Sequence, residues 1–251
     1  MATYELRALT IGEILDGGFT IYREHFGRLV GISVVFLGVP TLLGMFVEVS
    51  GGALDRPGLW FLSLLLFSIG WLPGSAAIVW SISEAALGRE PQVGTSVQVG
   101  FRKMLQLFVA GLAAYLIVLL GLLALVIPGL IVACGYSVVV QAVVLEDLGA
   151  GTDALGRSWK LTKGYKAKAL GLIVVVSLLI SVPYFAAGVV AAMVPAAAVA
   201  ILVLAQVVSF LVTPLFACML TLFYYDLRVR QEGFDLEHLG RELGFTPANV
   251  A

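Results

Sequence analysis

Few side chains in this sequence could do chemistry, and they do not cluster. Its two histidines are His25 and His238, and its two cysteines are Cys134 and Cys218. Both cysteines lie inside long apolar runs and both histidines lie in polar stretches beside such runs, a spacing that suits no catalytic triad, disulfide or metal site. The sequence therefore predicts no catalytic residue, no metal ligand and no cofactor, and it favours a protein that is not an enzyme.

A basic run is the densest group of charged residues. Its members are Arg157, Lys160, Lys163, Lys166 and Lys168. Beside an apolar segment, such a run can hold anionic lipid headgroups at about 1 kcal/mol per residue. It can equally serve only to fix the orientation of the chain in a membrane, and both interpretations stay open. We expect anionic membrane lipids as partners, with other membrane proteins as a second class. Acids in the same loops, such as Glu146 and Asp153, argue against nucleic acid.

A second set of candidate residues is polar but uncharged and lies inside the apolar runs. Its members are Gln206, Ser209 and Thr213, spaced three and four residues apart, together with Gln141 and Ser137. They could line a path for a solute, or they could hydrogen-bond neighbouring helices at about 0.6 kcal/mol per contact, which is the more frequent role. The middle of each run lacks Asp, Glu, Lys and Arg. Ion-coupled pumps usually keep such a residue there, so that class loses weight.

Membrane-spanning helices must position these residues. Of the 251 residues, 60% are hydrophobic and 12% are charged, whereas an average soluble domain has about half and about a quarter. A hydrocarbon core of roughly 30 Å is crossed by about 20 helical residues, and lipid forces the backbone to be helical. The predicted spans are residues 29–47, 59–82, 105–127, 130–145, 169–194 and 196–225. The predicted fold is therefore an all-α membrane protein, with tight turns at Pro128-Gly129 and at Pro195.

The basic residues also predict an orientation. Of the 15 Lys and Arg residues, Arg56 is the one that falls on the side opposite to the others. By the positive-inside rule, both termini are cytoplasmic, and the expected location is the inner membrane. The first residues carry several acids and no apolar core, so we expect no cleaved signal peptide.

An amphipathic stretch of helical period precedes each odd-numbered span. The apolar faces consist of Ile11, Leu15, Phe19, Tyr22, Phe26 and Leu29 in the first, Val93, Val97, Phe101, Met104 and Phe108 in the second, and Leu155 and Trp159 in the third. Stripes of this kind lie in the membrane interface with the apolar face down. We expect three interfacial helices, each leading into a hairpin of two spans.

Each even-numbered span ends on an acid, namely Glu84, Glu146 and Asp226. A negative charge at the C-terminal end of a helix opposes the helix dipole, so each acid should have a cationic partner on an interfacial helix or a neighbouring loop. The resulting division of the chain is a cytoplasmic segment with the first interfacial helix (1–28), a hairpin (29–92), two units of interfacial helix and hairpin (93–150 and 151–225) and a cytoplasmic tail (226–251).

Three stretches resemble a known family. They are IGEILDGGFTIYREHFGRL at the start, ALGRSWKLTKG following VVLED, and LFYYDLRVRQEGFDLE near the end. In this order they are similar to the bacterial integral membrane domain that in longer proteins precedes a glycerophosphodiester phosphodiesterase domain. The resemblance implies six spans with cytoplasmic interfacial helices and no established activity. The catalytic barrel of the longer proteins needs about 250 residues of its own, so no phosphodiesterase activity is expected here.

Three functions fit the sequence. The favoured one is a non-catalytic membrane module that interacts with lipid or docks partner proteins. The alternatives are a transporter or channel for a small or amphipathic solute, which would use the proline-broken spans, and an accessory subunit of a larger membrane complex. The sequence itself does not choose among them.

Overall fold

The computed structural model describes residues 8–233, except for the side chains of Ile180, Pro183 and Pro195. Within that range the chain is helical and contains no strand. The helices are α1 (Ile11–Glu24), α2 (Phe26–Val49), α3 (Pro57–Ala86), α4 (Val93–Ala124), α5 (Val126–Gly135), α6 (Val139–Leu145), α7 (Asp153–Leu161), α8 (Lys166–Met193) and α9 (Ala198–Glu232), with a short 3₁₀ turn at Pro195–Ala197 before the last.

Six segments in the described part of the chain are long and apolar enough to cross a membrane. They are α2, α3, α4, α5 with α6, α8 and α9. The prediction of an all-α, multi-pass membrane protein is thus confirmed. The fourth segment is not one continuous helix, because turns at residues 136–138 separate α5 from α6.

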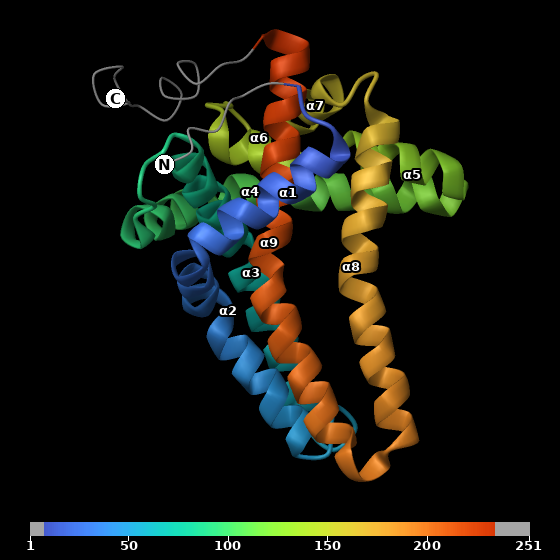
Figure 1. Cartoon of the computed structure of the whole chain (residues 1–251). Coiled ribbons are helices and arrows are strands. Elements are labelled where there is room, and N and C mark those ends of the chain that lie inside the picture. Colours follow the sequence, from blue (N-terminus) through green and yellow to red (C-terminus); the bar gives the residue numbers. More distant parts are fainter. Residues whose placement is uncertain (1–7, 234–251) are drawn as a thin grey trace.

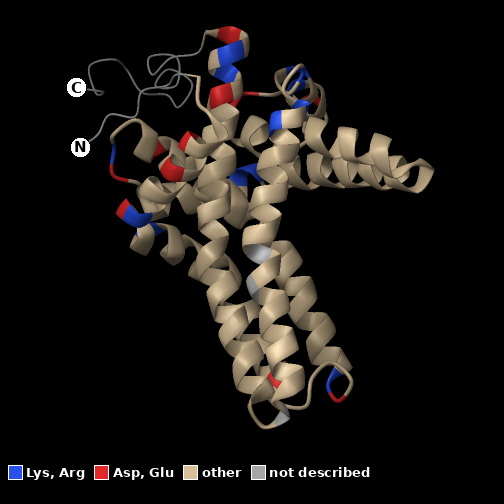
Figure 2. Ribbon diagram, turned by 45° about the vertical axis from the view of Figure 1, so that its right-hand side comes forward, with Lys and Arg blue, Asp and Glu red and all other residues tan. Residues whose placement is uncertain are grey.

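The long helices follow two directions. Helices α2, α3, α8 and α9 run alongside one another along the length of the molecule, whereas α4 and α5 run crosswise to them (Figure 1). Most of the described charged residues gather at one end of the long helices, and the crosswise pair leaves the molecule at that same end (Figure 2). We refer to this end as the charged end.

Glycines let the crossing helices approach closely. A Cβ atom on Gly70 of α3 would lie 2.3 Å from the carbonyl oxygen of Phe36 in α2, and one on Gly100 of α4 would lie 2.5 Å from the carbonyl oxygen of Pro73 in α3. Both distances are far below contact distance. Small residues at these two crossings are therefore required for the observed packing, as is typical of membrane helices.

The first predicted interfacial helix can be compared with α1. Helix α1 begins with a capping box between Thr10 and Glu13, and it buries Ile14, Gly17, Gly18 and Ile21. In the predicted stripe, Phe19 and Phe26 are exposed, Leu29 is buried, and Leu15 and Tyr22 pack partly against the core. Exposed apolar side chains suit contact with the membrane interface, and the placement of α1 there stays a prediction. The second predicted interfacial helix is not a separate element, because Val93 begins a single helix that continues to Ala124.

The tightest turn also falls earlier than predicted. Helix α4 ends at Ala124, Leu125 alone is extended, and Pro128 already lies in the first turn of α5. Proline is well tolerated there, because the first backbone N–H groups of a helix have no partner within it. A Cβ on Gly129 would lie 2.6 Å from the backbone nitrogen of Leu122, so glycine permits the close return of α5 along α4.

Candidate functional site

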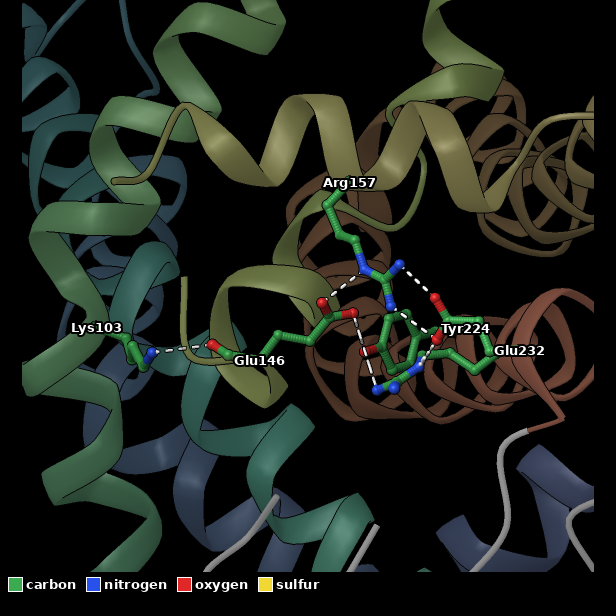
Figure 3. Close-up of polar contacts among 6 residues, drawn as sticks. Lys103, Glu146, Arg157, Tyr224 and Glu232 are labelled. Carbon is green, nitrogen blue, oxygen red and sulfur yellow. Dashed lines mark hydrogen bonds and ion pairs between the residues drawn. The ribbon is translucent and has the colours of Figure 1, made fainter. Parts of the chain in front are cut away.

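A network of ion pairs joins α7, α9 and the end of α6 at the charged end (Figure 3). Arg157 of α7 donates from Nε to Glu146 Oε2 at 2.6 Å and from its two terminal nitrogens to both carboxylate oxygens of Glu232 at 2.5 and 2.8 Å. Arg228 donates from Nε to Glu232 Oε2 at 2.8 Å and lies 3.9 Å from Glu146 Oε1. Two arginines thus face two carboxylates, and the charges of these four side chains balance.

A tyrosine hydroxyl and a lysine extend this network. The Tyr224 hydroxyl donates to Glu146 Oε1 at 2.7 Å and accepts from Arg228 Nη1 at 3.3 Å. Lys103 of α4 donates to the backbone carbonyl of Glu146 at 3.4 Å, which brings the base of the crosswise pair into the same network (Figure 3). Burial alone would lower the pKa of Arg157, but the carboxylates of Glu232 and Glu146 outweigh burial and raise it. Arg157 therefore stays charged.

A second network surrounds Asp226, whose side chain is fully buried. Its Oδ1 accepts from the backbone N–H of Leu9 at 2.6 Å and from Arg230 Nε at 2.8 Å, and its Oδ2 accepts from Lys168 Nζ at 2.5 Å. Lys168 and Arg230 also donate to the carbonyl of Leu9 at 2.6 and 2.8 Å. Asp226 thereby ties the segment before α1 to α8 and α9.

Glu84 is held differently from the other two acids. Its Oε2 accepts from the backbone N–H of Gln92 at 3.2 Å, just before α4 begins. Arg89 lies in the connecting loop between α3 and α4. Glu84 and Glu146 lie at the ends of α3 and α6, whereas α9 continues from Asp226 to Glu232. Glu146 pairs with Arg157 and Arg228, and Asp226 pairs with Lys168 and Arg230. Glu84 has the backbone amide of Gln92 and the nearby charge of Arg89.

The basic run divides into two groups. Arg157 and Lys168 form ion pairs with acids in the two networks. Lys160 and Lys163 are exposed, and within the described residues neither has an acidic partner. The ammonium group of Lys166 lies 3.2 Å from the ring centre of Trp159, a cation–π contact. We refer to Lys160, Lys163 and Lys166 as the lysine patch.

The predicted polar path is not assembled as one line. Ser209 and Thr213 line a hollow of about 290 Å³ between α8 and α9, but the Thr213 hydroxyl donates to the Ser209 carbonyl of its own helix at 2.8 Å. The amide of Gln206 lies against Gly44 of α2 instead. Ser137 donates to the carbonyl of Cys134 at 2.9 Å, and Gln141 is buried on α6, which packs against α3, α4 and α7.

Residues that could do redox, metal or acid–base chemistry stay apart. Among residues 8–233, no three His, Cys, Asp or Glu side chains are placed to hold a metal ion. Both cysteines are buried. His25 lies between α1 and α2, where burial and the nearby Arg28 lower its pKa. His238 lies outside the described residues, as do residues 1–7 and 234–251 of the predicted terminal segments.

The sequence reasoning missed four network residues of α9, namely Tyr224, Arg228, Arg230 and Glu232, although their spacing could have identified them. Tyr224, Arg228 and Glu232 follow one another at intervals of four, which places them on one face of α9, while Asp226 and Arg230 occupy a second face at the same interval. Charged residues at helical spacing after an apolar run indicate a helix that continues beyond the hydrocarbon, and α9 does continue to Glu232.

Comparison with known proteins gives a single finding. The family model of a domain of unknown function, DUF7847, matches residues 55–227, which is more than half of the chain. No curated protein and no solved structure matches the chain. The resemblance to the membrane domain that precedes phosphodiesterases stays a prediction.

Proposed function

This chain belongs to the DUF7847 family, and we propose that it is a non-catalytic membrane module whose lysine patch binds the headgroups of anionic lipids. In this proposal the charged end faces the cytoplasm, as the distribution of basic residues predicts. The leaflet it contacts is then the anionic one.

The observation that carries the proposal is the division of the basic run. Acids from α6 and α9 neutralise Arg157 and Lys168, so these two act as structural cations. Lys160 and Lys163 of the same run keep their charges exposed to the surroundings. A run that served only to fix orientation would need no such division, since the number of Lys and Arg residues on one side suffices for that.

The tryptophan in the patch supports the same conclusion. Trp159 lies beside Lys160 on α7, is 38% exposed, and is covered on one face by Lys166. Tryptophan prefers the level of the lipid headgroups, where its ring meets both apolar and polar surroundings. Two exposed ammonium groups and one ring at this level suit a phosphate diester with its attached chains.

The transport alternative has weaker support. It rests on the hollow between α8 and α9, but the lining of this hollow is mostly apolar and includes Leu179, Tyr184 and Phe216. Its polar members are Ser209 and Thr213, and Thr213 is already bonded within α9. The accessory-subunit alternative has no observation of its own and stays a prediction.

Native mass spectrometry with phosphatidylglycerol tests the proposal. The double variant Lys160→Gln/Lys163→Gln removes two charges worth about 1 kcal/mol each, which corresponds to roughly 30-fold weaker retention of this lipid. Phosphatidylcholine, which has no net charge, should be retained equally by both proteins.

The matched control is Arg23→Gln/Arg102→Gln, which removes two exposed cations of α1 and α4 and should leave retention unchanged. Equal loss of phosphatidylglycerol from the two double variants would show that general charge, and not the lysine patch, holds the lipid. Unchanged retention in the lysine variant would refute the proposal.

A further inference from the structure

The crosswise pair of helices projects beyond the rest of the molecule. We refer to residues 111–131, the outer part of α4 and the beginning of α5, as the arm. Gly129 is its one buried residue, and it is buried against Leu122 of the arm itself. At 1.5 Å per residue, the 14 residues from Gly111 to Ala124 extend about 21 Å.

The arm is apolar on all sides. It contains no charged residue, and its one polar side chain is the hydroxyl of Tyr115. Successive residues on α4 are exposed, as Tyr115, Leu116 and Ile117 show with 63, 48 and 39% exposure. Because successive helical residues point about 100° apart, these exposed side chains surround the helix. A helix that is apolar all round has to be buried on every side.

This property separates the arm from an interfacial helix and from a simple docking surface. An interfacial helix needs a polar face toward water, and the arm has none. A second copy of the chain would cover one side of the arm and leave the other sides in water. Acyl chains can enclose it completely.

A notch beneath the arm is also mostly apolar. It has a volume of about 920 Å³ and lies where α4 meets α3 and α6. Phe67 and Trp71 of α3 and Phe108 of α4 form part of its wall, with Ser68 and Ser75 as minor polar members. Water in such a notch would have few polar partners, whereas hydrocarbon would fill it favourably.

The base of the arm is fixed at the charged end. Lys103 and Gln106 of α4 donate to the carbonyls of Glu146 and Leu148, and Ser158 of α7 donates to the carbonyl of Gly135 at the end of α5. From this base the arm runs crosswise to the long helices (Figures 1 and 2). Its direction is therefore parallel to the membrane plane if α2, α3, α8 and α9 cross the membrane.

We propose that the arm lies inside the leaflet next to the charged end, parallel to the membrane plane, and that acyl chains of this leaflet surround it and fill the notch. Half of a 30 Å hydrocarbon core is about 15 Å thick, which accommodates a helix of about 10–12 Å diameter. The chain then crosses the membrane four times, and the arm displaces lipid from one leaflet alone. The inference does not depend on lipid binding by the lysine patch.

Spin labels along the arm test this placement. Cysteines replace Leu112, Leu116 and Leu123, which are exposed and share one face of α4, and the labelled protein is reconstituted in phosphatidylcholine vesicles. The accessibility of each label to oxygen, relative to a polar nickel chelate, reports its depth. We expect high oxygen access and nearly the same depth at all three positions. If α4 crossed the membrane instead, 11 residues would span about 16 Å of depth.

Helix α3 provides the matched control. Leu62→Cys and Ile69→Cys lie on one exposed face of α3, and their depths should differ by about 10 Å because that helix crosses the membrane. Unsubstituted protein gives the background, since Cys134 and Cys218 are buried.

Three outcomes would overturn the placement. A steady depth gradient along the arm would show that it crosses the membrane. Access to the nickel chelate along the arm would place it in water. Low access to both reagents would show that protein, such as a second copy, covers it. Each outcome is independent of phosphatidylglycerol retention by the lysine patch.

Discussion

The charged end and the arm satisfy their side chains in opposite ways. At the charged end, Asp226 is fully buried, and it is held by Leu9 and Lys168, which are distant in sequence, and by Arg230 of its own helix. Along the arm, Leu120 and Leu123 are 65% and 75% exposed and contact little of the protein. The charged end is therefore stabilised by internal contacts, whereas the arm depends on its surroundings.

Hydropathy does not distinguish contact with protein from contact with lipid, but the two regions differ in that respect. The fold of the charged end should be sensitive to single substitutions and indifferent to lipid. Substitutions on the arm should leave the fold intact and change only how the protein sits among lipids. Matched substitutions in the two regions test this difference.

The largest effect is expected at Asp226. Asp226→Asn removes the charge that faces Lys168 and Arg230 in a buried site, and losing one partner of such a pair costs about 3–5 kcal/mol. We expect a clearly lower midpoint of thermal unfolding in detergent. The control is Asp55→Asn in the exposed loop between α2 and α3, which should unfold like the unchanged protein. Equal midpoints for all three proteins would contradict the structural role of Asp226.

A leucine pair on α4 compares its base with the arm directly. Leu107 is 2% exposed, and Leu107→Ala should cost about 2–5 kcal/mol through a lost apolar contact and a cavity. Leu120→Ala on the arm removes the same atoms from an exposed position and should leave the unfolding midpoint unchanged. Destabilisation by Leu120→Ala comparable to that by Leu107→Ala would show that the arm packs against protein.

A tyrosine pair is expected to give the smallest effect. Tyr224→Phe removes the hydroxyl that donates to the Glu146 carboxylate and should cost about 1.5–3 kcal/mol, measured by the same thermal unfolding. Tyr115→Phe on the arm is the control, because that side chain is 63% exposed and makes no hydrogen bond within the described residues. A larger loss from the arm variant would reverse the comparison.

Much of the fold could be predicted from the sequence because its signals are local. Long uncharged runs such as that within α9 identify the apolar helices, and Thr10 with Glu13 identifies the start of α1. Glu146 and Asp226 could be picked out as acids in need of cations, since each ends an apolar run, and the structure places cations beside both.

The path of α4 and α5 could not be predicted. The connection between α8 and α9, around Val194, is as free of charge as the tip of the arm at Leu125. The first connection joins two long antiparallel helices, whereas the second ends a crosswise arm (Figure 1). The difference arises where Gly100 crosses Pro73 and where Lys103 reaches Glu146. Those are contacts between distant segments, which hydropathy does not encode. The assignment of Arg157 and Lys168 as the cations in these ion pairs could not be predicted for the same reason.

Labelling at the tips of two hairpins reports whether the arm lies within one leaflet. Leu54, in the loop between α2 and α3, is 95% exposed, and Leu125, at the tip of the arm, is 67% exposed. Leu54→Cys should react with a membrane-impermeant maleimide from one side of the membrane, while Leu125→Cys should react from neither side and become reactive after solubilisation in denaturing detergent. Reaction of Leu125→Cys from the same side as Leu54→Cys would show that α4 crosses the membrane and that the arm does not lie within one leaflet.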